Sequence, residues 1–445
     1  MSIKSIKLKN FKSINELNIE ANNQSQVICF VGENGSSKTS LLSLIVDSII
    51  SNLNISFPDY DPEAGKRFRS ISHMEIPNDK DYYFLNLKYS SGDKINNYER
   101  NVFKITKNQN NINIYNSVEW GKIPLNQFHQ EENTPYQDKN FNYLINNIFL
   151  YRPSYRYEPD ALEVNDLNDS YVFKISTQNK KQTDYPFPFK VAHSGTDLES
   201  LIIELLLDNF IGFENSMNAF SGIPRILNTV TNKDYGNFQI SRHPYRKLWS
   251  STQGLITSLS QGELDLLVTI TSIVTRQLYI YDNNEELRKK YKSFQDVPGL
   301  VIIDEVDLHL HPKAQENYLK VLTTSFKNIQ FLVTTHSPFV VRGLPTDSIV
   351  VQLPSGTVIE EDFSLMDIDS ITNTIFNYEG RFSNNIENDL KKFKELISNP
   401  NKEQNLNSLI EIYSKYRTSS SIIDELDTFL SIFSTPDLTK KVMGE

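Results

Sequence analysis

The stretch GENGSSKTS, residues 32–40, most constrains what this chain can fold into. It follows the apolar run VICFV and precedes residues 38–50, where leucine and isoleucine recur at helical spacing. A strand, a glycine-bearing loop and a helix form the context in which backbone N–H groups and a helix N-terminus bind phosphates. We therefore predict an ATP site here. Lys38 would contact the β- and γ-phosphates, and the hydroxyl of Thr39 would ligate Mg²⁺.

One residue of this loop departs from the pattern G-x-x-x-x-G-K-[ST], because Ser37 stands where glycine is expected before the lysine. Serine offers the same N–H, but its Cβ crowds a loop whose glycines permit unusual backbone angles. The sequence leaves open whether Ser37 slows or abolishes hydrolysis. The residues predicted to surround the phosphates are Asn34, Gly35, Ser36, Ser37, Lys38, Thr39 and Ser40.

Two further apolar runs end in polar residues that suit nucleotide hydrolysis. The run 299–303 ends at Asp304 and Glu305. Asp304 would hold Mg²⁺ through water, and Glu305 would polarise the attacking water. The run 331–335 ends at His336, which would contact the γ-phosphate or help to orient that water. Since these residues accompany Lys38 and Thr39, we expect an active ATPase and not a relic.

A fourth motif, LSQGE at residues 259–263, opens a strongly helical segment. Ser260, Gly262 and a helix N-terminus together form another anion site, for which we predict contact with the nucleotide. An isolated LSQGE is equally compatible with Ser260 being a simple helix N-cap.

In their order, these four motifs resemble the ABC-type ATPase head of RecF, SMC and OLD proteins. The opening residues LKNFKS (8–13) and the stretch DEVDLHLHP (304–312) also resemble that group. The resemblance implies that two copies sandwich two ATP molecules, with Ser260 of each copy capping the phosphate bound by the other. It covers roughly residues 1–55 and 250–355.

The segment IFLYRPSYRYE, residues 148–158, is similar to one in the Septu-type defence ATPases (PtuA). It stands where related heads carry a glutamine that contacts Mg²⁺, and it offers Arg152, Ser154 and Arg156 instead. By this resemblance, Arg152 or Arg156 would approach a phosphate or signal its loss.

Strands that alternate with helices predict an α/β fold with a parallel sheet, an ABC-ATPase head with a middle insertion and a helical tail. We expect one helix over residues 198–220 and irregular structure over 235–251. The predicted division is an N-terminal lobe (1–95), a middle region (96–250), a C-terminal lobe (251–360) and a helical tail for oligomer or partner contact (361–445).

Composition narrows the function classes. Lys and Arg number 45 against 55 Asp and Glu, which excludes a uniformly basic nucleic-acid coat. The basic stretch from Arg242 to Lys247 leaves direct DNA contact open. The single cysteine, Cys29, excludes an intramolecular disulfide and fits a reducing cytoplasm. We expect neither a signal peptide nor a membrane span.

Two residue pairs suggest sites that we disfavour. His309 and His311 lack a third metal ligand, so we expect a structural role for them at the seam of a dimer. Asp367 and Asp369 resemble half of a TOPRIM nuclease site, but no apolar strand precedes them. Asp367 fits better as a helix N-cap near Ser370.

The function predicted from these features is an ATP-dependent sensor or regulatory subunit of a bacterial anti-phage defence system. It would form a homo-oligomer and control a separate nuclease effector, of HNH type, in the cytoplasm. The alternative is a RecF-like repair ATPase that clamps DNA. A transporter subunit is disfavoured by the long interval between Lys38 and Ser260.

Overall fold

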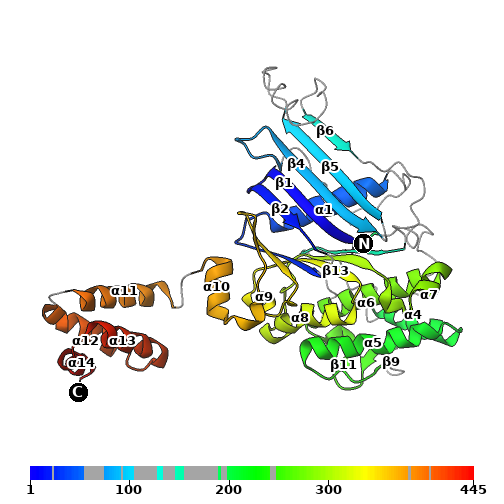
Figure 1. Cartoon of the computed structure of the whole chain (residues 1–445). Coiled ribbons are helices and arrows are strands. Elements are labelled where there is room, and N and C mark those ends of the chain that lie inside the picture. Colours follow the sequence, from blue (N-terminus) through cyan, green and yellow to red (C-terminus); the bar gives the residue numbers. More distant parts are fainter. Residues whose placement is uncertain are drawn as a thin grey trace, which may run out of the picture. The chain divides into compact units, whose positions relative to one another are not determined.

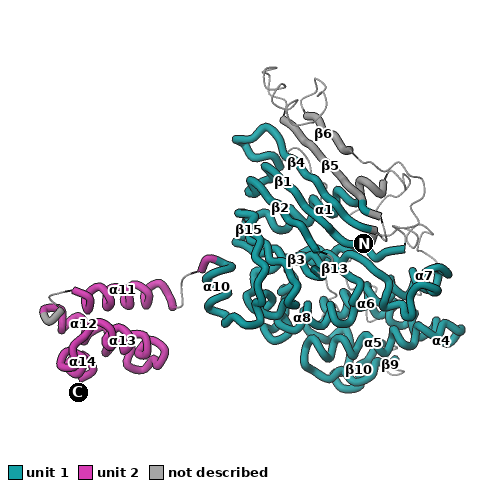
Figure 2. Tube along the Cα trace, in the orientation of Figure 1, with its two compact units in different colours: residues 1–376 teal, residues 377–445 magenta. Residues whose placement is uncertain are grey.

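The computed structural model comprises two compact units, residues 1–376 and residues 377–445, which Figure 2 colours separately. Each unit is described by itself. The residues described are 1–22, 25–54, 75–91, 94–104, 128–133, 146–154, 189–191, 198–240, 247–378, 382–399 and 402–444. The sequence also predicts a turn at residues 108–111, which lies outside them, and a loop over residues 160–190. Of that loop, residues 160–188 lie outside the described residues, and residues 189 and 190 belong instead to strand β8 (Phe189–Val191).

A seven-stranded sheet forms the centre of the first unit, in the order β15-β14-β3-β13-β12-β7-β8. Its strands run parallel except for β15, which pairs antiparallel with β14. This topology confirms the predicted α/β class. The strands are β3 (Val27–Val31), β7 (Ile148–Arg152), β8 (Phe189–Val191), β12 (Gly299–Ile303), β13 (Ile329–Thr335), β14 (Ile349–Gln352) and β15 (Thr357–Ile359).

Successive side chains of the central strands enter two different cores, as the period of a strand requires. In β3, Val27, Cys29 and Val31 belong to one core, while Ile28 and Phe30 belong to the other. The first core is completed by four helices, which lie below β13 in Figure 1: α4 (Leu198–Phe210), α5 (Glu214–Thr231), α6 (Gln261–Asp282) and α8 (Pro312–Ser325). The second is completed by α1 (Lys38–Asn54) and a second sheet. Burial on both faces explains why β3 and β12 read as continuous apolar runs.

The second sheet is antiparallel, in the order β2-β1-β4-β5-β6. Its alternating strand β1 places Ile6 and Leu8 in the core and leaves Lys7 and Lys9 outside. The strands are β1 (Ser2–Phe11), β2 (Ile14–Glu20), β4 (Tyr82–Ser91), β5 (Lys94–Lys104) and β6 (Phe128–Asn133).

The middle of the chain differs from the prediction in two places. The single helix expected over 198–220 is wrong, because the chain turns at Gly212 (φ 105°) between α4 (Leu198–Phe210) and α5 (Glu214–Thr231). The N–H of Phe213 donates to the Asp208 carbonyl, which closes the end of α4. The irregular stretch instead contributes β9 (Phe238–Ile240) and β10 (Leu248–Ser250), which form a small sheet with β11 (Gly254–Leu255).

The remaining helices of the first unit are α6 (Gln261–Asp282), α7 (Glu285–Lys290), α8 (Pro312–Ser325), α9 (Pro338–Arg342) and α10 (Ile368–Phe376). Of these, α6 begins after Ser260 as predicted from the LSQGE motif, and α10 lies in the stretch predicted to form a helical tail. The second unit contains α11 (Asn384–Ser398), α12 (Leu406–Lys415), α13 (Ser420–Phe433) and α14 (Pro436–Met443). No helix among the described residues has the length and apolar character needed to span a bilayer. The division at residues 95, 250 and 360 stays a prediction.

Candidate functional site

The loop between β3 and α1 carries the candidate phosphate site. Ser37 adopts φ 71°, the left-handed region that glycine favours, so the departure seen in the sequence is a real backbone constraint. Its hydroxyl lies 2.7 Å from the hydroxyl of Ser13 and accepts a 3.3 Å hydrogen bond from the Ser13 N–H. The turn between β1 and β2 thereby anchors the serine that replaces glycine.

Lys38 is the first residue of α1, and its side chain is buried. Its ammonium donates to the carbonyls of Gly32 (2.8 Å) and Glu33 (2.9 Å) and to the Ser36 hydroxyl (3.3 Å). Burial lowers the pKa of Lys38, while nearby carboxylates oppose that shift. The charge therefore lies where the motif predicts phosphates.

The neighbouring hydroxyls of α1 have different surroundings. Thr39 is exposed, as a ligand for an ion carried by a nucleotide requires. Ser40 is buried and accepts a 2.7 Å hydrogen bond from Lys12. Lys12 also forms an ion pair with Glu75 at 3.2 Å, so Ser40 belongs to a contact between the loop and the second sheet.

Strand register brings the other predicted residues to the same edge of the central sheet. Val31 pairs with Thr335, and Val333 pairs with Ile303. The residues that follow these strands are the phosphate loop, His336 and Asp304, which are far apart in sequence. The carboxyl ends of parallel strands are where ligands bind in folds of this class.

Asp304 and Glu305, the adjacent carboxylates that follow β12 (the DE pair), differ in environment. The side chain of Asp304 is fully buried, and its Oδ1 accepts a 2.5 Å hydrogen bond from the Thr334 hydroxyl. Glu305 is half-buried with φ 49°, and its N–H donates to the same Thr334 hydroxyl at 2.7 Å. One threonine thus orients both residues, which suits separate roles for them.

His336 and Asp307 form the next contact between these strand ends. Asp307 Oδ1 accepts hydrogen bonds from the Thr335 hydroxyl (2.6 Å) and the His336 N–H (3.3 Å). Burial and the Lys38 ammonium lower the pKa of His336, against the opposing effect of Asp307 and Asp304. His336 is therefore neutral at pH 7 and can donate one hydrogen bond and accept another.

Sequence reasoning missed Thr334 and Asp307. The third carboxylate of DEVD and the paired threonines before His336 were the available signals. Their partners lie 28 to 30 positions away along the chain. Spacing alone does not show such pairs.

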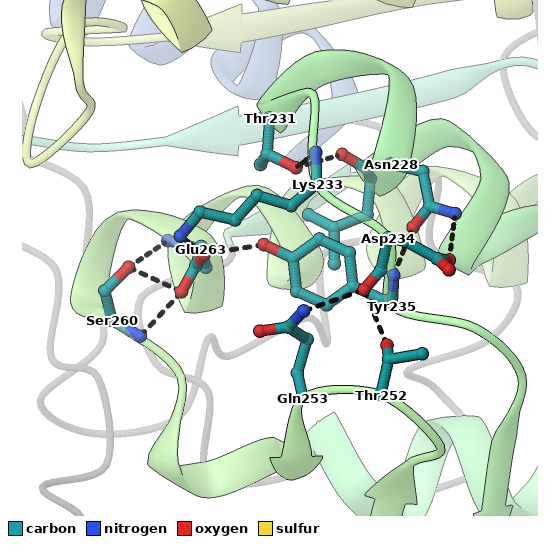
Figure 3. A network of polar contacts seen from close by, with 10 residues as sticks. Asn228, Thr231, Lys233, Asp234, Tyr235, Thr252, Gln253, Ser260 and Glu263 are labelled. Carbon is teal, nitrogen blue, oxygen red and sulfur yellow. Dashed lines mark hydrogen bonds and ion pairs between the residues drawn. The ribbon is translucent and has the colours of Figure 1, made fainter.

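Ser260 stands at the N-terminus of α6 and is bound to Glu263 in a capping box. The Ser260 hydroxyl and N–H both donate to Glu263 Oε2, at 2.7 and 2.9 Å. The other oxygen, Oε1, accepts from Lys233 and from the Tyr235 hydroxyl, both at 2.6 Å (Figure 3). Burial opposes ionisation of Glu263, but these hydrogen bonds outweigh it and lower the pKa to about 2.

Gly262 packs against the loop that follows the DE pair. A Cβ at this position would lie 2.2 Å from the His309 carbonyl oxygen. Helix α6 therefore contacts that loop so closely that only glycine fits at this position. A role of Gly262 toward nucleotide stays a prediction.

Arg152 does not occupy the position expected of a phosphate contact. Its side chain is completely buried and forms an ion pair with Asp265 of α6, which is also buried. This ion pair thus connects β7 to α6. Ser154 ends the described part of this segment, and Arg156 lies outside it.

The disfavoured sites have structural explanations. His311 caps α8 by accepting from the Lys313 N–H at 3.3 Å, and in the part of the chain that the structure describes no three His, Cys, Asp or Glu form a metal-binding group. Asp367 accepts from the Ser370 N–H at 2.8 Å, which confirms the expected cap. Lys247 pairs with Glu199 at 3.5 Å, whereas 241–246 lie outside the described residues.

The donors near the loop fit Mg²⁺ better than a transition metal. A hydroxyl from Thr39 and a carboxylate from Asp304 are the oxygen ligands that Mg²⁺ prefers, usually together with phosphate oxygens and water. These two residues would hold the ion. It would supply charge neutralisation at the phosphates.

Part of this chain is similar in sequence to known proteins. Residues 255–342 match the family model described as "AAA domain, putative AbiEii toxin, Type IV TA system". "Retron Vc95 probable ATPase" of Vibrio cholerae serotype O1 biovar El Tor is 35% identical over 121 residues, which cover 26% of this chain and 22% of the relative. "Septu protein PtuA" of Bacillus mycoides (strain KBAB4) is 39% identical over 67 residues, 15% of this chain and 9% of the relative.

These matches span less than a quarter of each relative's own length. Among solved structures, an SmcHead bound to the C-winged helix domain of ScpA matches with a TM-score of 0.42 and 14% identity. That match covers 81% of this chain and 97% of the other.

Proposed function

We propose that this chain, which is related in sequence to a retron ATPase and to Septu PtuA, is the regulatory ATPase of a bacterial anti-phage defence system. The observation that carries the proposal is the convergence of Lys38, Asp304 and His336 at one sheet edge. We further propose that ATP drives assembly of a homo-oligomer, which restrains a separate nuclease effector of HNH type.

In the proposed reaction, the N–H groups of residues 34–39 and the Lys38 ammonium bind the phosphates of ATP. Glu305 polarises the attacking water, and neutral His336 orients that water or contacts the γ-phosphate. Thr334 and Asp307 hold these groups in place. Ser260 of a second copy would donate a hydrogen bond to the phosphate.

Two variants of the ATP site test this function. Lys38→Ala removes the charge in the loop and is expected to abolish ATP binding. Glu305→Gln keeps the shape of the side chain but removes the base, so it is expected to bind ATP, to lower hydrolysis by roughly 100-fold or more, and to accumulate in the assembled form. Glu361→Gln, an exposed carboxylate outside the site, is the matched control.

The partner is tested by tagging the Glu305→Gln chain in its own host and measuring native masses with and without ATP. A stoichiometric nuclease subunit supports the defence proposal and shows the copy number. Recovery as an ATP-dependent dimer with DNA and no protein partner would replace it with a RecF-like DNA clamp. Wild-type turnover by Glu305→Gln would refute the role of Glu305.

A further inference from the structure

Glu263 is the centre of a hydrogen-bond network that includes Ser260. Its two carboxylate oxygens have different partners. Oε2 accepts from the Ser260 hydroxyl and N–H, whereas Oε1 accepts from Lys233 and Tyr235 (Figure 3). The second pair of contacts lies outside the LSQGE motif, in the turn that follows α5.

The hydroxyl proton of Ser260 is committed to Glu263 in this arrangement. A serine hydroxyl carries one proton, so it cannot donate to Glu263 and to a phosphate at the same time. A hydroxyl that donates to Glu263 presents only lone pairs to an approaching anion. Glu263 and a phosphate oxygen would therefore compete for this proton.

We infer that Lys233 and Tyr235 are positioning residues that weaken the hold of Glu263 on Ser260 and so allow the serine to donate to the phosphate bound by a second copy. This inference rests on the proposed nucleotide-driven assembly. A carboxylate that already accepts from an ammonium and a phenol is a weaker acceptor at its other oxygen. Burial raises the pKa of Glu263, but the hydrogen bonds from Lys233 and Tyr235, together with those from Ser260, lower it by more.

The turn that carries Lys233 and Tyr235 is fixed from two sides. The Tyr235 N–H donates to Asn228 Oδ1 of α5 at 3.0 Å, and its carbonyl accepts from the Ser250 hydroxyl of β10 at 2.6 Å. Gln253 and Thr252 both donate to the Asp234 carbonyl (Figure 3). Tyr235 is therefore held in place independently of its contact with Glu263.

Lys233 differs from Tyr235 in its exposure. Its side chain is 57% exposed, against 12% for Glu263, so its ammonium lies at the surface beside Ser260. Replacing Lys233 removes both the hydrogen bond and a positive charge near the anion. Tyr235→Phe removes a single oxygen and no charge, and so isolates the effect on Glu263.

The test uses the purified full-length Glu305→Gln protein, with Mg²⁺ and ATP as the probe. Sedimentation velocity measures the ATP concentration that gives half-maximal assembly. A fluorescent ATP analogue at low protein concentration measures binding to a single copy. We expect Lys233→Ala and Tyr235→Phe to need five- to tenfold more ATP for assembly, with single-copy binding unchanged within twofold.

Two matched variants sharpen the result. Lys233→Arg restores a donor and a charge, so it is expected to restore assembly. Lys289→Ala, which breaks the exposed pair with Glu285, is expected to behave as the parent.

Three outcomes would overturn the inference. Unchanged assembly in Lys233→Ala and Tyr235→Phe would mean that the network does not affect Ser260. An equal loss of single-copy binding and assembly would mean that it serves only to stabilise α6. Failure of the Glu305→Gln parent to assemble with ATP would instead refute the proposed function, and the inference with it.

Discussion

Ser37 departs from the phosphate-loop motif in its backbone conformation as well as in its side chain. The loop keeps its N–H groups, and the cost lies in the backbone, because an L-residue in the left-handed region is strained by about 1–2 kcal/mol. The contact with Ser13 offsets part of this cost, by roughly 0.5–1 kcal/mol for a hydrogen bond at the surface.

Replacing Ser37 with glycine separates these two effects. The variant loses the contact with Ser13 but also the strain, so we expect a melting temperature no lower than the parent and hydrolysis within about threefold of it. Ser13→Ala loses the contact without relieving strain, and we expect its KM for ATP to rise about two- to fivefold. Steady-state ATPase assays measure both. Acceleration of Ser37→Gly by tenfold or more would show that Ser37 acts as a brake.

At the scale of single residues, those within the motifs could be predicted from the sequence, but the residues that contact and position them could not. Lys38, Asp304 and His336 follow from the pattern of apolar runs that end in polar residues. Lys233 and Ser13 have no such signal, because their importance arises from contacts across 30 and 24 positions.

Among the elements, β7 and α6 are joined by the buried pair of Arg152 and Asp265. The resemblance to defence ATPases drew attention to Arg152 but suggested the wrong partner. The sequence did not indicate Asp265 as the partner of Arg152, because Asp265 lies in a helix whose other buried residues are mostly apolar.

Neutralising one residue of the Arg152–Asp265 pair should destabilise the protein more than replacing both residues with apolar ones. Asp265→Asn leaves the Arg152 charge buried, so we expect the free energy of unfolding to fall by about 3–5 kcal/mol. The double variant Arg152→Met with Asp265→Leu leaves no buried charge at these positions, so its free energy of unfolding should fall by less. Both tryptophans precede residue 377, so urea unfolding followed by tryptophan fluorescence reports on the first unit alone. A double variant less stable than Asp265→Asn would contradict this account.

Long elements with strong periodicity were predicted well, and short ones were not. The helix predicted to open at LSQGE begins at Gln261, and the apolar run at residues 27–31 forms the whole of β3. The break at Gly212 was hidden by apolar residues on both sides, including Phe210 and Phe213, which are exposed at the turn. Strands of three residues, such as β9, are stabilised by their neighbours and leave no period in the sequence.

For the molecule as a whole, the second unit has a hydrophobic core of its own. Leu390, Phe393, Leu409 and Leu426 are buried within it. α10, which precedes it, places Ile371 and Ile375 in the core of the first unit. The boundary after Phe376 therefore interrupts neither core.

Truncation after Phe376 tests whether the tail serves assembly. We expect the shortened chain to bind ATP with an affinity within about threefold of the full chain, because the predicted site residues all lie in the first unit. Its native mass with ATP is expected to show fewer copies. Loss of ATP binding would mean that the second unit is needed to form the site, and an unchanged copy number would place assembly elsewhere.

The order of the central sheet has a consequence for the synthesis of this protein. β3 emerges early, yet both of its neighbours, β13 and β14, are encoded about 300 residues later. At about 5–20 residues per second, the ribosome needs roughly 15–60 s to supply them. During that interval, a five-residue strand of apolar side chains has neither of its native partners. The nascent chain should therefore depend on chaperones that shelter β3 until residues 329–352 have been translated.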